Sequence, residues 1–215
     1  MRIYRVKAAP DQLRETGFPG WQAVAEERLA MMPSLVELTG AVSPYLAANR
    51  GHGATKEIRV RMAHDGQMLS VRLEWANPEP RDKIEDLDQF VDAAAVMFAT
   101  DKLASAISMG SANAPVNAWL WQSDEDQPYD VIAEGYGTSQ RRSGAKSSLS
   151  VSQQHMDKRR SVVFQRPLSC DDASCVSFVP GTDARVAFSV WSGANSERSG
   201  QKSFSGEFVT LTIDA

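Results

Sequence analysis

Two cysteines, Cys170 and Cys175, lie five positions apart in the 215-residue sequence, close enough to react with one another. No second pair of Cys or His residues has the spacing of a structural zinc site, so the cysteines do not indicate zinc. If the chain is exported, an oxidising compartment favours a local disulfide between them. Two free thiols are the alternative, and the sequence leaves both open.

The three histidines are His52, His64 and His155, and none of them belongs to a catalytic motif. His64 lies in a predicted hairpin turn and is expected to be solvated. His52 lies between two glycines, and His155 lies in a polar run. The sequence contains no Ser-His-Asp order, phosphate-binding loop or paired-carboxylate motif, so none of these enzyme chemistries is indicated.

Residues 186–206 begin as a strand, because Val186, Phe188 and Val190 alternate with smaller residues. A run rich in Ser, Gly, Asn, Glu and Arg follows, which is the composition of a loop. Lys202 closes this loop, and residues 207–213 return to a strand pattern. A lysine in such a loop is normally a solvated cation, so its position alone gives Lys202 no role.

Two motifs occur in order along the chain. The first is a Met-Gly loop upstream of Pro-Val-Asn-x-Trp-x-Trp, present as Met109-Gly110 and Pro115-Val116-Asn117-Ala118-Trp119-Leu120-Trp121. The second is Val-Trp followed by Glu-Arg-x-Gly-x-Lys, present as Val190-Trp191 and Glu197-Arg198-Ser199-Gly200-Gln201-Lys202. From Lys56 onward the chain therefore resembles the haem b gamma subunit of periplasmic molybdenum enzymes related to dimethyl sulfoxide reductase. Known members belong to ethylbenzene dehydrogenase, dimethyl sulfide dehydrogenase, selenate reductase and chlorate reductase.

The resemblance implies that Met109 and Lys202 are the two axial ligands of a haem iron. A haem that only transfers electrons needs two strong axial ligands and no open position. A thioether is a soft ligand that favours ferrous iron and so raises the reduction potential. A lysine binds as the neutral amine, so the site must lower its pKa from the free value of about 10.4. Burial and the charge of the iron both act in that direction.

One departure from the family pattern affects the methionine. The family often has Pro and Phe directly before Met-Gly, whereas residues 104–108 here are Ala, Ser, Ala, Ile and Ser. Met97 and Met156 are therefore kept as alternative sulfur ligands, and His155 as an alternative nitrogen ligand. Glu197 and Arg198 are expected either to shape the lysine loop or meet a haem propionate, or to be exposed to solvent.

The Cys-x-x-Cys-His motif of covalently attached haem is absent, so the resemblance implies one non-covalent haem b. It also implies two partner subunits, one catalytic with a molybdenum bis-guanine-dinucleotide cofactor and one carrying iron–sulfur clusters. The haem would pass electrons between the iron–sulfur subunit and a soluble periplasmic c-type cytochrome, and this subunit would not act on the substrate. We favour a chlorate or selenate reductase, with a dimethyl sulfide or ethylbenzene-type dehydrogenase as the alternative.

The composition is ordinary for a globular protein, with 42% hydrophobic and 23% charged residues, and we predict a single domain over residues 1–215. The formal net charge of −4 argues against non-specific nucleic-acid binding. No apolar run approaches the roughly 18 residues of a membrane helix, so no membrane partner is expected. No signal peptide is visible at the start, yet the resemblance implies a periplasmic location.

Many short strand patterns separated by turn signals predict a mainly β fold, an antiparallel β-sandwich with a few short helices in the connections. Residues 57–62 and 68–75 alternate on either side of a His-Asp-Gly turn and are expected to form a hairpin. Further strands are expected at residues 90–98, 115–122 and 161–168. Residues 101–108 are expected to form a helical turn, and residues 135–154 a long surface loop with a short strand at its end.

The segment before residue 33 gives conflicting signals. Helical spacing relates Trp21, Val24, Ala25, Leu29 and Met32. Prolines bracket the segment, and the resemblance implies instead a strand at residues 28–32.

Besides a haem subunit, two other functions fit a β-sandwich. Tryptophans on such a fold can stack on sugars, and Trp75, Trp119, Trp121 and Trp191 would form that platform in a carbohydrate-binding module without cofactor. Packing in the core is the other explanation for these tryptophans. A structural sandwich subunit with no ligand is the third possibility.

Overall fold

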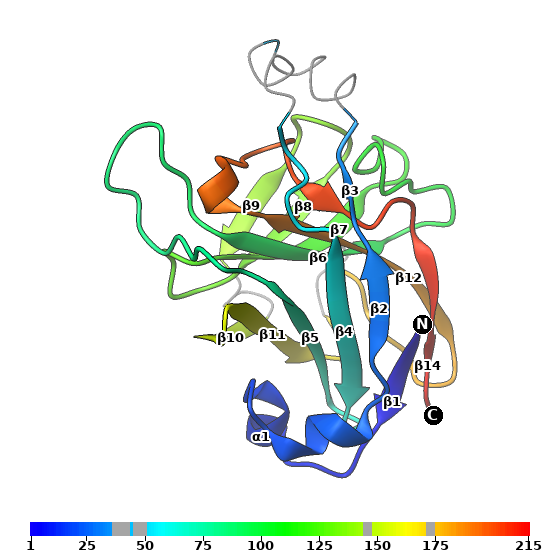
Figure 1. Ribbon diagram of the computed structural model, residues 1–215. Coiled ribbons are helices and arrows are strands. Elements are labelled where there is room, and N and C mark those ends of the chain that lie inside the picture. Colours follow the sequence, from blue (N-terminus) through cyan, green and yellow to red (C-terminus); the bar gives the residue numbers. More distant parts are fainter. Residues whose placement is uncertain (36–43, 45–50, 144–147, 171–174) are drawn as a thin grey trace.

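The computed structural model describes residues 1–35, 44, 51–143, 148–170 and 175–215. Its strands form one hydrogen-bonded path that folds into two layers, and β6, β7 and β12 cross the direction of β4 and β5 (Figure 1). The predicted β-sandwich is therefore confirmed. Among the described residues, no helix has the length and apolarity needed to cross a membrane.

We name the two layers sheet A and sheet B. Sheet A contains β14 (Val209–Ile213), β12 (Asp183–Trp191), β6 (Ala93–Ala99), β7 (Val116–Gln122), β8 (Tyr129–Ala133) and β9 (Gln140–Ser143), and the short strands β13 (Ser203–Phe204) and β3 (Met32–Pro33) extend it beside β12. Sheet B contains β10 (Ser150–Met156), β11 (Arg159–Pro167), β5 (Met68–Ala76), β4 (Glu57–His64) and β2 (Glu27–Ala30). β1 (Arg2–Arg5) links the sheets by pairing in parallel with both β14 and β4. The other named strand pairs are antiparallel.

Strand β6 shows how the sequence builds sheet A. Side chains alternate between faces along a strand, so Ala94, Val96 and Phe98 point into the sandwich while Ala93 and Ala95 point outward. Both sets are buried, which explains why the sequence reads as one continuous apolar run. The outward set is small, and this leaves room above the sheet.

Aromatic side chains fill the space between the two sheets. Phe98 packs edge-on against Trp119 and Phe178, with 4.8 Å between ring centroids in each pair. Trp75 meets Trp121 edge-on at 6.3 Å. Burying a large apolar side chain contributes about 1.5–3 kcal/mol, so this cluster is a main source of stability and fixes the face that each strand turns inward.

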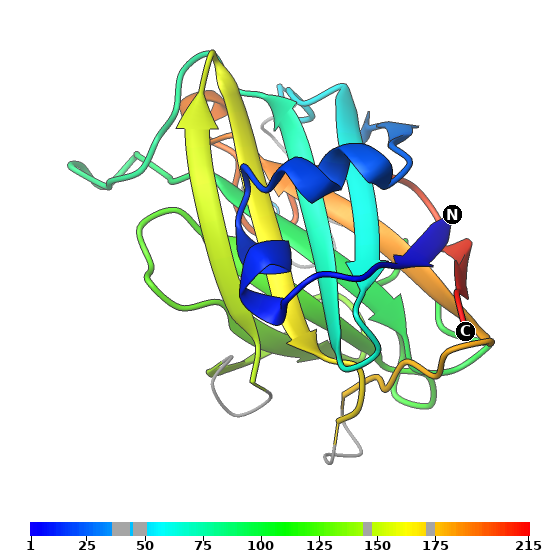
Figure 2. The same ribbon diagram turned by 90° about the horizontal axis from the view of Figure 1, so that it is seen from below.

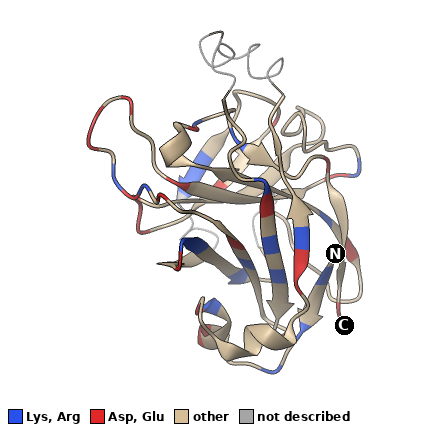
Figure 3. Cartoon of the chain, in the orientation of Figure 1, with Lys and Arg blue, Asp and Glu red and all other residues tan. Residues whose placement is uncertain are grey.

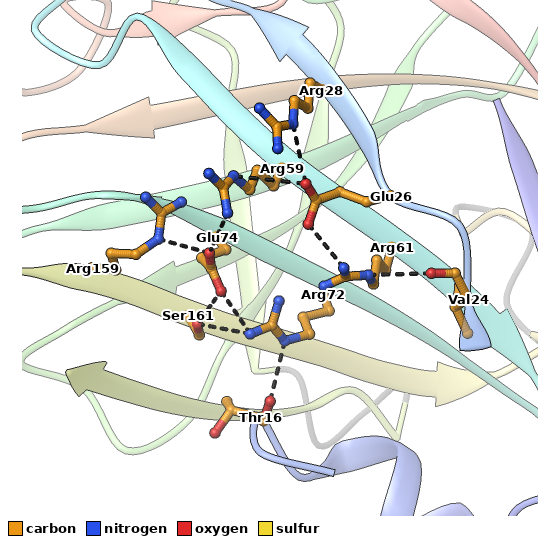
Figure 4. Close-up of polar contacts among 10 residues, drawn as sticks. All are labelled: Thr16, Val24, Glu26, Arg28, Arg59, Arg61, Arg72, Glu74, Arg159 and Ser161. Atoms are coloured by element: carbon orange, nitrogen blue, oxygen red, sulfur yellow. Dashed lines mark hydrogen bonds and ion pairs between the residues drawn. The ribbon is translucent and has the colours of Figure 1, made fainter. Parts of the chain in front are cut away.

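The outer face of sheet B is covered by the first helices of the chain (Figure 2). The side chains of Leu13 in α1 (Pro10–Arg14) and Trp21 in η1 (Pro19–Ala23) pack against Ala63 and Val163. Beside them, ion pairs join side chains of neighbouring strands (Figure 4), namely Glu26, Arg28, Arg59, Arg61, Arg72, Glu74 and Arg159. Figure 3 shows Lys and Arg along β2 and β4.

Several expected elements are confirmed. The hairpin occurs as β4 and β5, and the strands expected at residues 90–98, 115–122 and 161–168 occur as β6, β7 and β11. The strand implied by the resemblance occurs as β2, whereas the helical spacing around Trp21 gives only the 3₁₀ turn η1.

Three expectations were wrong. Residues 135–154 contain the unexpected strand β9, because polar residues are tolerated in strands at the ends of a sheet, whereas the short strand expected at the end of this stretch occurs as the start of β10. Residues 101–108 form turns without a helix in the described structure. His64 is fully buried rather than solvated, because β4 pairs there with β1, and burial lowers the pKa of its imidazole.

Candidate functional site: an apolar cavity on the outer face of sheet A

A cavity of about 580 Å³ lies on the outer face of sheet A. Its floor is formed by the outward side chains of three adjacent strands, and these are mostly small: Ala93, Ala95, Met97, Ala118, Leu120 and Ser189. Its walls come from loops, with Ile84 and Phe90 on one side and Tyr136 and Arg141 on another. Ile84 is 53% exposed, so the cavity opens to solvent beside it.

The Met109-Gly110 turn is held in one conformation above this floor. Met109 has a positive φ of 57° and Gly110 one of 83°, a pair of left-handed residues that reverses the chain. A Cβ on Gly110 would lie 2.9 Å from the carbonyl oxygens of Ala114 and Ala133, so only glycine fits. The amide of Gly110 donates to Ser105 O at 2.9 Å. The turn therefore fixes the position from which the Met109 thioether reaches the cavity.

A carboxylate braces the segment before Met109. Glu207 accepts hydrogen bonds from Ser105 Oγ at 2.6 Å and from the amide of Ala106 at 2.7 Å. Burial acts to raise the pKa of Glu207, but these hydrogen bonds, that of the Phe208 amide and the charge of Arg185 outweigh it and lower the pKa. The segment 105–110 is thereby tied to the chain just before β14.

Lys202 is buried, and its side chain reaches the same cavity. Its Nζ lies 3.8 Å from Met109 Sδ and 5.0 Å from the centroid of the Trp191 ring. Burial lowers the pKa of Lys202 from 10.5 to about 8, since charging the amine away from water is costly. Its backbone is fixed as well, because Ser34 N donates to Lys202 O at 3.0 Å.

Glu197 makes hydrogen bonds within the loop that carries Lys202, because its Oε2 accepts from the amide of Ser192 at 2.8 Å, and this supports the expectation that it shapes the loop. Glu197 is only 1% exposed, so the alternative of a solvated side chain was wrong for it. The guanidinium of Arg198 lies 4.3 Å from the centroid of the Phe90 ring, and both residues line the cavity. Whether either meets a haem propionate stays a prediction.

The sequence profile of the family described as ethylbenzene dehydrogenase matches residues 30–161, more than half of this chain. The chain belongs to this family. The resemblance to the gamma subunits is therefore confirmed.

Three relatives extend the match. A Haloferax mediterranei protein provisionally named a respiratory nitrate reductase heme subunit is 34% identical over 92% of this chain and 67% of its own length. The dimethylsulfide dehydrogenase subunit gamma of Rhodovulum sulfidophilum is 31% identical over 91% of this chain and 74% of its own. The chlorate reductase subunit gamma of Ideonella dechloratans is 29% identical over 75% of this chain and 66% of its own.

Solved structures with a similar fold include carbohydrate-binding proteins. A family 9 carbohydrate-binding module of Caldicellulosiruptor kristjanssonii in complex with glucose has a TM-score of 0.53 at 13% identity, covering 100% of this chain and 96% of that one. A protein of Bacteroides uniformis, provisionally named carbohydrate-binding, has a TM-score of 0.57 at 8% identity, covering 100% and 98%. At such identities the likeness shows the sandwich fold alone.

The predicted sugar-stacking platform does not form in this member of the ethylbenzene dehydrogenase family. Trp75, Trp119 and Trp121 are each at most 2% exposed, so core packing explains them. Trp191 alone lies at the cavity, where its ring faces the lysine ammonium. The sequence analysis missed this role, although Trp191 is the outward residue after the inward Val190 and the alternation could have revealed it.

The structure separates the candidate ligands. Met109 and Lys202 meet at the cavity, and Met97 lies on its floor. Met156 is 60% exposed on β10, and His155 Nε2 lies 2.8 Å from Asn77 O, with neither residue lining the cavity. His52 is buried with Nε2 2.8 Å from Ser34 O. The assignment of Met109 and Lys202 as ligands stays a prediction, and their meeting supports it.

The two cysteines are joined as a disulfide in the structure, with their Cα atoms 6.2 Å apart. Their loop belongs to the connection from β11 to β12, which crosses from sheet B to sheet A. The oxidation state of the protein in solution stays a prediction. Neither cysteine lines the cavity.

The residues at the cavity fit a haem. Lys202 and Met109 would hold the haem iron through one nitrogen and one sulfur donor. Lys202 Nζ and Met109 Sδ lie 3.8 Å apart and both residues line the cavity, so the two donors reach the same space. The small, apolar floor suits a flat macrocycle. Among the described residues no cluster of three or more His, Cys, Asp or Glu could hold a metal ion by itself.

Proposed function

We propose that the cavity on sheet A binds one non-covalent haem b, with Met109 and Lys202 as axial ligands, and that the chain is the electron-transfer subunit of a molybdoenzyme. The observation that carries this proposal is the approach of a buried amine to a thioether, 3.8 Å apart over an apolar floor. When bound, the haem supplies a one-electron redox centre. With both axial positions taken by side chains, the site binds no substrate of its own.

Each residue has a separate task in this proposal. Lys202 offers a neutral amine because burial has brought its pKa to about 8, so deprotonation at neutral pH costs about 1–2 kcal/mol instead of nearly 5. Met109 offers a soft sulfur that favours the reduced state. The small side chains of Ala93 and Ala95 leave room for a ligand above the sheet, and Trp191 shields Lys202 from water.

The relatives support the role in a larger enzyme. Two of them are named as gamma subunits, of dimethylsulfide dehydrogenase and of chlorate reductase, and a third as a heme subunit. We infer a molybdenum-containing catalytic subunit and an iron–sulfur subunit as partners, and a soluble c-type cytochrome as the exchange partner in the periplasm. We favour a chlorate or selenate reductase, and the same role in a dimethyl sulfide or ethylbenzene-type dehydrogenase is the alternative.

Visible spectroscopy tests the haem proposal. Protein purified with haem available is expected to show a b-type spectrum whose bands sharpen and shift on reduction with dithionite. The haem should extract into acid acetone, because no covalent bond to cysteine attaches it to the chain. A protein that stays colourless after reconstitution with haem would contradict the proposal.

A further inference from the structure

Glu197 is a carboxylate enclosed by N–H donors. Its Oε1 accepts from the amides of Gly53 at 2.7 Å and Ala54 at 2.8 Å, and from Asn195 Nδ2 at 3.0 Å. Its Oε2 accepts from the amide of Ser192 at 2.8 Å. One buried side chain thus joins the segment before β4 to both ends of the short helix η3 (Gly193–Asn195).

The joined segment is the one that leads to Lys202. It leaves β12 at Ser192 and contains two non-glycine residues with positive φ, Ser196 at 54° and Ser199 at 51°. Left-handed backbone is unfavourable for residues other than glycine, so the loop needs contacts that hold this path. Ser199 O accepts from Trp191 Nε1 at 3.0 Å, which fixes the middle of the loop. The bonds to Glu197 fix its beginning.

The charge of Glu197 is not neutralised by a cation in the described structure. None of the ion pairs among these residues includes it, and its described hydrogen bonds come from three amides and an uncharged side chain. Amide hydrogen bonds do not cancel the charge of a carboxylate in the way that a cation does. Because Glu197 also lines the cavity, it places a fixed negative charge beside whatever binds there.

We propose that Glu197 is a positioning residue that locks the Lys202 loop and that its buried charge lowers the reduction potential of the haem. This inference rests on the proposed function and adds a tuning residue to it. A nearby negative charge stabilises the more positive, oxidised form of a redox centre, and the effect is large where water is excluded. Glu197 therefore opposes the thioether of Met109, which favours reduction.

Glu197→Gln keeps the shape of the side chain and removes its charge. With its oxygen toward Gly53, Ala54 and Asn195 it loses only the bond from the Ser192 amide, because an NH2 group cannot accept. The haem-loaded variant is expected to keep a low-spin spectrum and to have a more positive midpoint potential than the parent in a redox titration. Glu57→Gln is the matched control, because it removes the same charge from an exposed position at the start of β4. An equal potential in Glu197→Gln and Glu57→Gln would overturn the tuning role.

Glu197→Ala tests the positioning role without any haem. Loss of the four hydrogen bonds is expected to speed amide hydrogen exchange in haem-free protein by roughly tenfold or more around residues 51–55 and 192–202, because bonds to a charged acceptor contribute about 1.5–3 kcal/mol. Amide exchange rates in Glu197→Ala that match those of the parent would contradict the positioning role of Glu197. A parent that takes up no haem would instead defeat the proposed function and the tuning role, while the exchange result still decides positioning.

Discussion

The outer faces of the two sheets are built from the same alternating pattern but covered in opposite ways. On sheet B, long Arg and Glu side chains lie across β4 and β5, and α1 and η1 pack beside them, so the face is filled. On sheet A, the corresponding outward positions of β6 are alanines except for Met97, and the loops that cover them leave the space unfilled. The size of the outward-facing side chains therefore decides whether the face of a sheet is filled or can hold a ligand.

The two faces also treat charge differently. Glu74 on sheet B is bridged by Arg59, Arg72 and Arg159, so its charge is compensated. The Nζ of Lys202, above sheet A, has no carboxylate among its described contacts, which are a thioether and an aromatic ring. Pairing with arginines stabilises the buried carboxylate of Glu74. The amine of Lys202 has no such partner among its described contacts and is costly to bury, so it fits a functional role.

The largest effect is expected from filling the cavity floor. Ala95→Phe places a ring where the haem would lie and is expected to weaken haem binding by roughly a hundredfold or more, since overpacking costs 1–3 kcal/mol or more. Ala30→Phe adds the same ring at an exposed position of β2 and should bind haem like the parent. Titration with haem measures both. Unchanged binding by Ala95→Phe would mean that the floor is not the ligand site.

A second test asks whether Lys202 is costly to bury. Its folded pKa of about 8 lies below the ordinary 10.5, so the unfolded chain binds the proton more tightly. The penalty is full below pH 8 and fades as the pH rises to 10.5. Haem-free Lys202→Met is therefore expected to be more stable than the parent by about 2 kcal/mol at pH 7, after allowing about 1 kcal/mol for the Trp191 ring.

Urea unfolding at pH 7 and pH 10.5 measures that difference. The gain of Lys202→Met should shrink at the higher pH, and a loss of stability at pH 7 would show that the ammonium is not penalised in the fold.

Breaking the compensated cluster on sheet B should affect stability alone. Burial acts to raise the pKa of Glu74, but hydrogen bonds from Arg72 and Arg159 outweigh it and lower the pKa. Its stabilisation is thus present above pH 4.5 and lost as the pH falls through the lower folded value. Glu74→Gln is expected to cost about 2 kcal/mol at pH 7, between exposed and fully buried pairs, and to leave the haem spectrum unchanged. A changed spectrum would show that the two faces are coupled.

The smallest effect is expected in the connection between the sheets. The Cys170–Cys175 bond closes a short loop, so replacing both by Ser should cost about 1–2 kcal/mol and leave the spectrum as it is. Titration of the denatured, non-reduced parent should detect almost no free thiol. Two thiols per chain in protein from an oxidising compartment would rule out the bond.

The sequence predicted the positions of the strands better than the contacts between residues far apart in the chain. Alternation located β4, β5 and β12, because a strand with one buried face has an apolar residue at every second position. It missed the edge strand β9 and the buried state of His64, since both depend on which distant strand lies alongside. The contact between Met109 and Lys202 joins residues 93 positions apart, and only the family resemblance brought them together in advance. The hydrogen bonds of Glu197 to residues 53 and 54 were likewise outside any local pattern.

Magnetic circular dichroism of the haem-loaded parent, Met109→Ala and Lys202→Ala tests the central claim most directly. The parent is expected to show a low-spin methionine–amine signature. Met109→Ala should lose it and lower the midpoint potential, because the soft ligand is gone. Lys202→Ala should turn high-spin in the ferric state with haem still bound. A bis-histidine signature in the parent, or the parent's low-spin spectrum kept by both variants, would contradict the assignment of these two ligands.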